Sequence, residues 1–262
     1  MKISLVQLEI VKKEKERNFS KISKLIKKIN SDVILFPEFF ATGYLGKDSK
    51  KYAEKIGGKS SVFLKNIAKE KNANVIAGII EKEKNKCKNK IRNVALVYDK
   101  KARLKASYSK IHLFSLADEQ KYFNAGNALS VFDINGIKCS VLICYDLRFP
   151  EIFRKLADKN VKLIFLMANW PDSREEHWLT LIKARAIENQ IFIAAANMVG
   201  KIEDKNYFGS SVVVDPWGNF VKKAKKNKEE IITTDIDLNE VDKIRNKFNV
   251  FKDRKTKLYN EL

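Results

Sequence analysis

The chain has 262 residues, of which 45% are apolar and 32% charged, a balance that supports a large buried core and excludes wholesale disorder. Lys and Arg outnumber Asp and Glu by 52 to 32, which gives a formal net charge of +20. Only nine of these bases are Arg, the residue that reads phosphates and base edges bidentately, and the Lys residues are dispersed, so we expect no nucleic-acid partner.

The predicted elements begin with a strand over residues 2–8, and strands then alternate with helices. Apolar runs of strand length follow at 33–36, 75–80, 94–98, 129–134, 137–143, 162–167, 191–197, 211–214 and 231–236. Helical periodicity marks 18–30, 60–71 and 174–188. Because several of the strands are almost entirely apolar, we expect sheets that are buried on both faces and covered by helices.

Turn residues predict two hairpins near the middle and the end of the chain. Asn135-Gly136 joins two apolar runs as a two-residue loop, and residues 215–218, Asp-Pro-Trp-Gly, form a second turn. No Pro-rich, Gly-rich or Ser-rich break divides the chain, so we predict one domain over 1–262, with a partly amphipathic tail from about 240 that packs on a partner subunit. No apolar run approaches the ~18 residues of a membrane span, and the first ten residues are too short for a secretory signal.

Three cysteines bear on the compartment and on the chemistry. Cys87, Cys139 and Cys144 form no CxxC pair and have no His at zinc-ligand spacing, which argues against a disulfide or zinc framework and favours a reducing cytoplasm. Cys144 follows the strand 137–143 and precedes a helix predicted to begin at Pro150. A thiol at such an elbow is placed to act as a nucleophile, although a small buried side chain is the more common fate of a free cysteine at a strand end.

Several groups could activate this thiol. His112 and His177 are the only histidines, and spacing alone excludes neither as the base of a Cys–His pair. Glu38 follows the apolar run 33–36 and stands among aromatic residues, where desolvation suits a carboxylate to the role of general base. Taken alone, Glu38 also reads as an ordinary loop acid.

Three sequence motifs, found in a fixed order along the chain, point to one enzyme family. LFPEFFATGY (35–44), YSKIHLF (108–114) and LICYDLRFPE (142–151) resemble the Glu, Lys and Cys motifs of the nitrilase superfamily of carbon–nitrogen hydrolases. The resemblance extends over most of the chain, through YFNAG (122–126), NWPDSREEHW (169–178), KARAIENQ (183–190) and DPWG (215–218). It implies an α/β fold of the α+β type, arranged as a four-layer α-β-β-α sandwich.

The resemblance also implies roles for individual residues. Glu38 is the general base, Lys110 the cation, Cys144 the nucleophile that forms a thioester, and Glu119 the second glutamate that supports the lysine or the water. Lys110 and the backbone N–H of Tyr145 hold the oxyanion, and no metal or organic cofactor is required. Asp146 and Arg148 are expected to brace the elbow.

Within the superfamily, CYDLRFPE, ANWP, HW and ARAIENQ are similar to the omega-amidase branch, which hydrolyses the terminal amide of 2-oxoglutaramate or 2-oxosuccinamate. A substrate with an amide and a carboxylate needs a cation near the nucleophile, and Arg148, Arg174 and Lys201 are the candidates. The expected substrate-binding set is Phe40, Tyr44, His112, Tyr145, Arg148, Asn169, Trp170 and Arg174. His112 is interpreted as a packing or supporting residue rather than a catalyst.

Alternative functions remain open at this stage. The same Glu-Lys-Cys chemistry could act on a nitrile, an N-carbamoyl compound or deaminated glutathione, and a catalytically idle scaffold or a basic nucleic-acid-binding protein are more remote readings. The resemblance implies a homodimer or a higher homo-oligomer, with the helix after Cys144 and the helix over 174–188 at the interface, and neither a membrane nor a nucleic acid as partner.

Overall fold

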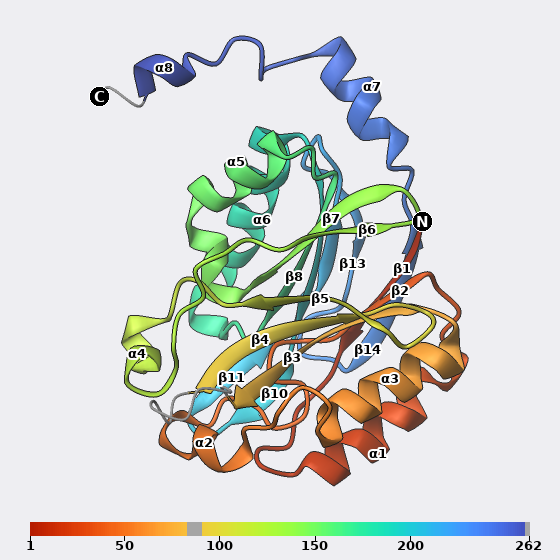
Figure 1. Ribbon diagram of the computed structural model, residues 1–262, viewed down its shortest axis with the longest axis vertical. Coiled ribbons are helices and arrows are strands. Elements are labelled where there is room, and N and C mark those ends of the chain that lie inside the picture. The colour runs from red at the N-terminus through yellow and green to blue at the C-terminus, as the bar shows by residue number, and fades with distance from the viewer. Residues whose placement is uncertain (83–90, 260–262) are drawn as a thin grey trace.

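Two six-stranded sheets form the centre of the computed structural model, which describes residues 1–82 and 91–259 (Figure 1). The first sheet has the order β14 (Glu230–Asp235), β1 (Lys2–Gln7), β2 (Val33–Leu35), β3 (Asn74–Lys82), β4 (Ile91–Tyr98) and β5 (Leu104–Ser109). The second has the order β13 (Phe220–Lys223), β12 (Val212–Val214), β9 (Phe192–Asn197), β8 (Leu163–Ala168), β7 (Ile137–Ile143) and β6 (Val131–Ile134). A separate hairpin pairs β10 (Val199–Ile202) with β11 (Lys205–Phe208).

Helices cover the outer face of each sheet. The longer helices are α1 (Lys15–Leu25), α3 (Lys59–Lys71), α5 (Pro150–Asp158), α6 (Glu175–Asn189) and α7 (Asn239–Lys247), and the short ones are α2 (Ser49–Tyr52), α4 (Glu119–Tyr122) and α8 (Thr256–Tyr259). Figure 1 shows α1 and α3 on one side of the molecule and α5 and α6 on the other. None of the helices in the described part of the chain has the length and apolar character of a membrane span.

Successive side chains of a strand point to opposite faces of its sheet and so enter different parts of the hydrophobic core. In β2, Val33 and Leu35 join the cluster that lies between the two sheets, and Ile34 joins the cluster beneath α1 and α3. This follows from the period of two in a strand, which sends successive side chains to opposite faces. The central strands are thus buried on both faces and mainly apolar, and the predicted four-layer α-β-β-α sandwich is confirmed.

All ten predicted strands and the helices over 18–30, 60–71 and 174–188 appear in the structure; the strand over 137–143 has the predicted bounds, and the others are shifted at one or both ends. The Asn135-Gly136 hairpin is also confirmed: Ile134 pairs with Ile137, and φ is +52° at Asn135 and +82° at Gly136, as a type I′ turn requires. The strands that the apolar pattern missed are β5, β10, β11 and β13. Each is short or polar, and β5 and β13, which lie at sheet edges, have mostly exposed side chains and so need no apolar run.

Parallel strand directions bring several strand ends to one side of the sandwich. β2 runs parallel to β3, and β3–β4 and β4–β5 are antiparallel, so β2 and β5 end at the same edge of the first sheet. In the second sheet β7, β8 and β9 are mutually parallel. Glu38, Lys110, Cys144 and Asn169 all come shortly after the carboxyl ends of these strands.

The start of the C-terminal tail packs on its own chain. In α7, Val241 and Ile244 are buried, and Asp242 forms an ion pair with Lys162 at the start of β8. Arg245 donates to the backbone oxygen of Asn189 at the end of α6. The first part of the tail, α7, therefore contacts the second sheet and α6 of its own chain. Packing of the tail on a partner subunit stays a prediction.

Candidate active site

Three buried charges form the centre of the site. The ammonium of Lys110 donates to Glu38 Oε1 at 3.1 Å and to Glu119 Oε1 at 2.9 Å, and each of these residues is less than 5% exposed. Lys110 follows β5, Glu38 follows β2, and Glu119 begins α4. Lysine has three N–H donors, so within the described part of the chain one donor remains available to a substrate oxygen.

Glu38 is fixed by donors from both sheets. Asn93 Nδ2 in β4 donates to Glu38 Oε1 at 2.6 Å, and the backbone N–H of Asn169, after β8, donates to Glu38 Oε2 at 3.0 Å. Gly78 in β3 packs directly under this segment, since a Cβ there would stand 2.2 Å from the end of the Met167 side chain and 3.2 Å from the backbone nitrogen of Phe39. The carboxylate is therefore positioned before any substrate arrives.

Cys144 lies at a strained turn between β7 and the 3-10 helix Cys144–Arg148. Its φ is +47°, in the left-handed region that residues other than Gly rarely adopt. Asp146 supports the turn, because its Oδ2 accepts hydrogen bonds from the backbone N–H of Ile143 at 3.0 Å and from the hydroxyl of Tyr108 at 2.7 Å. The strain at Cys144 directs its side chain out of the strand direction, beside the buried charges.

The charges around Cys144 hold it as a thiol in the free protein. Burial, the carboxylate of Glu38 and that of Glu119 raise the pKa of Cys144 well above its ordinary value, and the attraction of Lys110 does not offset them. Burial opposes the charge of Lys110, but Glu38 and Glu119 outweigh it and raise the pKa of Lys110 well above its ordinary value. Burial, with repulsion from Glu38, also raises the pKa of Glu119 despite the attraction of Lys110. The arrangement therefore holds a cation and a thiol whose proton needs an acceptor.

A narrow cavity of two joined compartments opens onto Cys144. The compartment of about 50 Å³, which we call the triad compartment, is lined by Glu38, Phe39, Tyr44, Lys110, Phe114, Ala117, Glu119, Cys144, Asn169, Pro171, Arg174, Lys205 and Tyr207. The compartment of about 40 Å³, the arginine compartment, is lined by Phe114, Cys144, Tyr145, Arg148, Asn169, Trp170, Pro171 and Arg174. The small volumes favour a small substrate.

Two guanidinium groups face the arginine compartment. Arg148 stacks 4.9 Å from the Trp170 ring centroid, and Arg174 stacks 5.2 Å from that of Phe114. In the described part of the chain neither has a carboxylate within ion-pair distance; the arginines that form ion pairs lie elsewhere. Burial and the neighbouring charge of Arg174 lower the pKa of Arg148, which remains a cation. Two cations without a counter-ion favour an anionic group in this compartment.

The structure brings most of the sequence-predicted residues to this cavity and places others elsewhere. Tyr44, Tyr145, Arg148, Asn169, Trp170 and Arg174 line it, together with Glu38, Lys110, Glu119 and Cys144. Phe40 does not: it is fully buried in the core beneath α1 and α3, where it stacks on Phe19. The expected pocket wall at Phe40 is therefore wrong, and its neighbour Phe39, with a φ of +50°, forms the wall instead.

His112 supports the site without lining the cavity. Its Nδ1 lies 2.8 Å from Asp146 Oδ1, and its ring stacks on Phe149 at a centroid distance of 3.6 Å. His177 contacts Arg148 through Nδ1 at 3.1 Å. Lys201, the third candidate cation, is exposed in β10 and lines neither compartment. Asp146 pairs with Tyr108 and His112 and so braces the elbow as predicted, whereas the Arg148 side chain faces the cavity.

Sequence reasoning missed several residues of the site. Phe39, Phe114, Lys205 and Tyr207 line the cavity, and Asn93 holds Glu38. Phe39 lies in the Glu motif (35–44) and Phe114 in the Lys motif (108–114), so their positions in these motifs could have indicated that they line the site. Lys205 and Tyr207 come from the hairpin β10–β11, which carries no apolar run. A bridge between Pro171 and Tyr207 joins this hairpin to the site. Cys139 is buried in β7, and Cys87 lies outside the described residues.

Comparison with known proteins identifies the family. The model of the carbon–nitrogen hydrolase family matches residues 2–246. The chain belongs to the carbon–nitrogen hydrolases of the nitrilase superfamily. Among curated relatives of this hydrolase, the 2-oxoglutaramate amidase of Bacillus subtilis is 36% identical over 98% of both chains. Omega-amidase NIT2-B of Xenopus laevis is 34% identical, over 98% of this chain and 96% of the relative.

Solved structures agree with this assignment. The carbon–nitrogen hydrolase superfamily protein XC1258 of Xanthomonas campestris matches with a TM-score of 0.91 and 28% identity, over 97% of both chains. That structure is described as carrying an arsenic adduct in its active site. This carbon–nitrogen hydrolase is therefore omega-amidase-like in sequence and has the nitrilase-superfamily fold. Its cavity combines a thiol, a buried cation and two carboxylates, which is a set that can perform nucleophilic acyl transfer.

Proposed function

We propose that this carbon–nitrogen hydrolase cleaves the terminal amide of a small dicarboxylic omega-amide, of the 2-oxoglutaramate or 2-oxosuccinamate type, and releases ammonia. The observation that carries the proposal is the pair Arg148 and Arg174, which line the same narrow cavity as Cys144 and have no carboxylate partner in the described part of the chain. Guanidinium groups match the planar carboxylate of such a substrate. The relatives named as 2-oxoglutaramate amidase and omega-amidase support the same substrate class.

In the first half of the reaction, the sulfur of Cys144 attacks the amide carbon while Glu38 accepts the thiol proton. The Cys–His alternative lacks support, because His112 is engaged with Asp146 and His177 with Arg148. The remaining N–H of Lys110 and the backbone N–H of Tyr145 stabilise the tetrahedral oxyanion, at about 3 kcal/mol or more for each donor. Glu38 then protonates the leaving nitrogen, the C–N bond breaks, and ammonia departs from a thioester.

In the second half, water replaces ammonia beside Glu38. Glu38 takes a proton from the water as its oxygen attacks the thioester carbon, and the C–S bond breaks as the thiol regains its proton. Glu119 keeps Lys110 in position in both halves through the contact at 2.9 Å. The products are the dicarboxylate and the free enzyme.

We further propose that the enzyme works in the cytoplasm as a homodimer. A nucleophilic thiol persists in a reducing compartment, which supports the first part. The exposed apolar side chains of Ile187, Trp217 and Phe248 beside α6 support the second.

Ammonia release from a panel of candidate substrates tests the proposal. We expect turnover of 2-oxoglutaramate or 2-oxosuccinamate by the native chain, none by Cys144→Ala, and an acyl adduct on Cys144 in mass spectra after brief exposure. The panel should include a nitrile, an N-carbamoyl amino acid and deaminated glutathione. Turnover of one of these without release from either oxo-amide would contradict the proposed substrate class but leave the thioester chemistry in place.

A further inference from the structure

Asn169 carries a buried side chain whose polar atoms lack partners. Its Nδ2 and Oδ1 are both inaccessible to solvent, and neither makes a hydrogen bond with the described residues. The residue is 9% exposed and lines both compartments beside Cys144. A buried donor and a buried acceptor without partners destabilise a folded protein, so their presence in a cavity points to a ligand that satisfies both.

The backbone of Asn169 contacts the proposed base. Its N–H donates to Glu38 Oε2 at 3.0 Å, so the side chain belongs to the residue that directly contacts the proposed base. Asn197 shows the contrast, because its carboxamide is fully used. Its Oδ1 accepts from the Trp170 N–H at 2.8 Å, and its Nδ2 donates to the backbone oxygens of Trp170 and Gly209. Asn197 holds a loop, whereas the Asn169 side chain holds nothing in the described structure.

We propose that the Asn169 carboxamide recognises the carboxamide of the substrate, an inference that rests on the proposed function. A primary amide presents a carbonyl acceptor and an N–H donor side by side, and a second amide group is complementary to both. Nδ2 of Asn169 donates to the scissile carbonyl oxygen, and Oδ1 accepts an N–H of the leaving nitrogen. The pairing needs one donor and one acceptor, so it holds whichever way the side-chain amide is oriented.

The same pairing distinguishes substrate from product. The product has two carboxylate oxygens in place of one oxygen and one NH₂, and both are acceptors. Oδ1 of Asn169 then faces an oxygen lone pair instead of an N–H, which disfavours the bound product. Asn169 is thus a specificity-determining residue that selects an amide and favours release of the acid.

The test compares an amide with an ester in Asn169→Ala. The backbone N–H to Glu38 persists in this variant, so only the side chain is removed. The two substrates are 2-oxoglutaramate and the γ-methyl ester of 2-oxoglutarate, which keeps the carbonyl but has no N–H. We expect the ratio of kcat/KM for the amide to that for the ester to fall about tenfold, because one hydrogen bond is lost with the amide alone. The melting temperature should stay the same or rise, since two unsatisfied buried atoms are removed.

Asn197→Ala is the matched control and should lower the melting temperature while reducing amide and ester hydrolysis in proportion. An unchanged amide-to-ester ratio in Asn169→Ala would overturn the inference, as would a large drop of its melting temperature with loss of both activities. Failure of the proposed function is distinguished by the native chain alone. If the native chain hydrolyses nitriles or carbamoyl compounds and not the oxo-amide, the proposed substrate class is wrong, whatever the Asn169 variant does.

Discussion

The guanidinium groups of Arg148 and Arg174 set the charge of the arginine compartment. Each is stacked on an aromatic ring, at Trp170 and Phe114 respectively, so the cations are held in place without a carboxylate. A stacked guanidinium keeps its N–H edge available to a planar anion. At the scale of single residues, the proposed function therefore assigns to these two arginines the choice between acidic and neutral amides.

Replacing either arginine should weaken binding of acidic amides. We expect Arg148→Gln and Arg174→Gln each to raise KM for 2-oxoglutaramate about tenfold or more, because a hydrogen-bonded ion pair with the substrate is lost. KM for a neutral amide such as butyramide should hardly change. Steady-state kinetics measure both, with Lys201→Gln as the control, since Lys201 is exposed and lines neither compartment. Equal losses for acidic and neutral amides would contradict the carboxylate-binding role.

The pKa of Cys144 gives a second prediction at this scale. Burial and the negative charges of Glu38 and Glu119 raise it, so Glu119→Gln removes one of the groups that disfavour the thiolate. The sign follows: the pKa of Cys144 falls in the variant, and at a given pH more of the thiolate is present. The midpoint of the pH profile of alkylation by iodoacetamide should therefore move to lower pH, while turnover falls because Lys110 loses its support. A midpoint that moves to higher pH would contradict this electrostatic account.

At the scale of secondary-structure elements, Asp146 joins the end of β5 to the end of β7. It accepts from the hydroxyl of Tyr108, from the backbone N–H and the ring of His112, and from the backbone N–H of Ile143. Lys110 lies between Tyr108 and His112, and Cys144 directly follows Ile143. One fully buried carboxylate thus sets the spacing between the cation of the first sheet and the nucleophile of the second.

Asp146→Asn tests this connection. An amide has one acceptor oxygen in place of two and points a donor at groups that already donate, so we expect a loss of about 2–3 kcal/mol in the free energy of unfolding. Activity should fall with it, because Lys110 and Cys144 lose their common support. Tyr108→Phe is the milder companion, with a loss of about 1 kcal/mol. Denaturant unfolding measures both, and a neutral Asp146→Asn would show that the elbow is held by other contacts.

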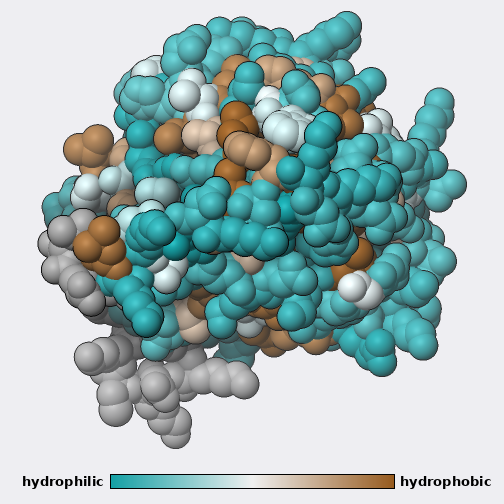
Figure 2. Space-filling model, turned by 90° about the horizontal axis from the view of Figure 1, so that it is seen from above, coloured by the Kyte–Doolittle hydropathy of each residue, from teal (hydrophilic) through white to brown (hydrophobic). Residues whose placement is uncertain are grey.

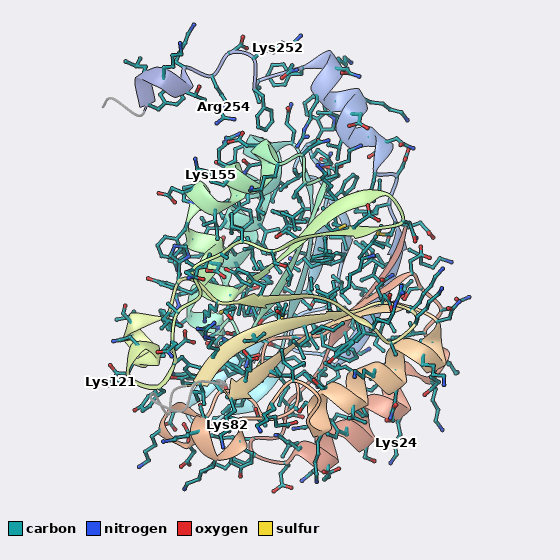
Figure 3. The ribbon with its side chains drawn as sticks, viewed as in Figure 1. Lys24, Lys82, Lys121, Lys155, Lys252 and Arg254 are labelled. Carbon is teal, nitrogen blue, oxygen red and sulfur yellow. The ribbon has the colours of Figure 1, made fainter. Side chains whose placement is uncertain are left out.

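At the scale of the whole molecule, basic side chains surround the sandwich. Lys24, Lys82, Lys121, Lys155 and Lys252 extend outward from different elements around the outline (Figure 3). The view from above likewise shows a mainly hydrophilic surface with small apolar areas (Figure 2). A charge spread in this way raises the local concentration of anionic substrates without forming a single binding stripe.

An apolar surface beside α6 stands out from this charge. It consists of Ile187, Trp217, Phe220 and Phe248, each more than 40% exposed. Trp217 stacks on Phe248 at 6.4 Å, and the turn at Gly218 lies against Ile187, so these three side chains lie close together. Lys183 and Lys223 lie over the ring of Phe220. Contiguous exposed apolar surface commonly marks an interface, and this region includes one of the two helices expected there.

The proposed homodimer can be tested at this surface. Ile187→Asp places a charge in the apolar region, and we expect it to shift the protein from dimer to monomer without changing its circular dichroism. Sedimentation velocity at several concentrations gives the mass. Lys24→Asp, which changes a distant exposed residue on α1, should leave the dimer intact. A native chain that sediments as a monomer would refute the proposal directly.

The sequence by itself determined most of the buried strands and the position of the nucleophile after a strand, because these depend on local patterns, whereas the four layers were implied by the resemblance to the nitrilase superfamily. Apolar runs predicted the buried strands, including those that end just before Glu38 and Cys144, and Asn135-Gly136 predicted its hairpin. Lys110 was found only through its motif, because the polar strand β5 before it gives no apolar signal. Tertiary structure decided which side chains form the cavity wall. The left-handed turn at Phe39 sends Phe40 into the core, and Asn93, Lys205 and Tyr207 arrive from elements distant in the chain. Such contacts depend on how sheets, hairpins and loops pack, which no local pattern specifies.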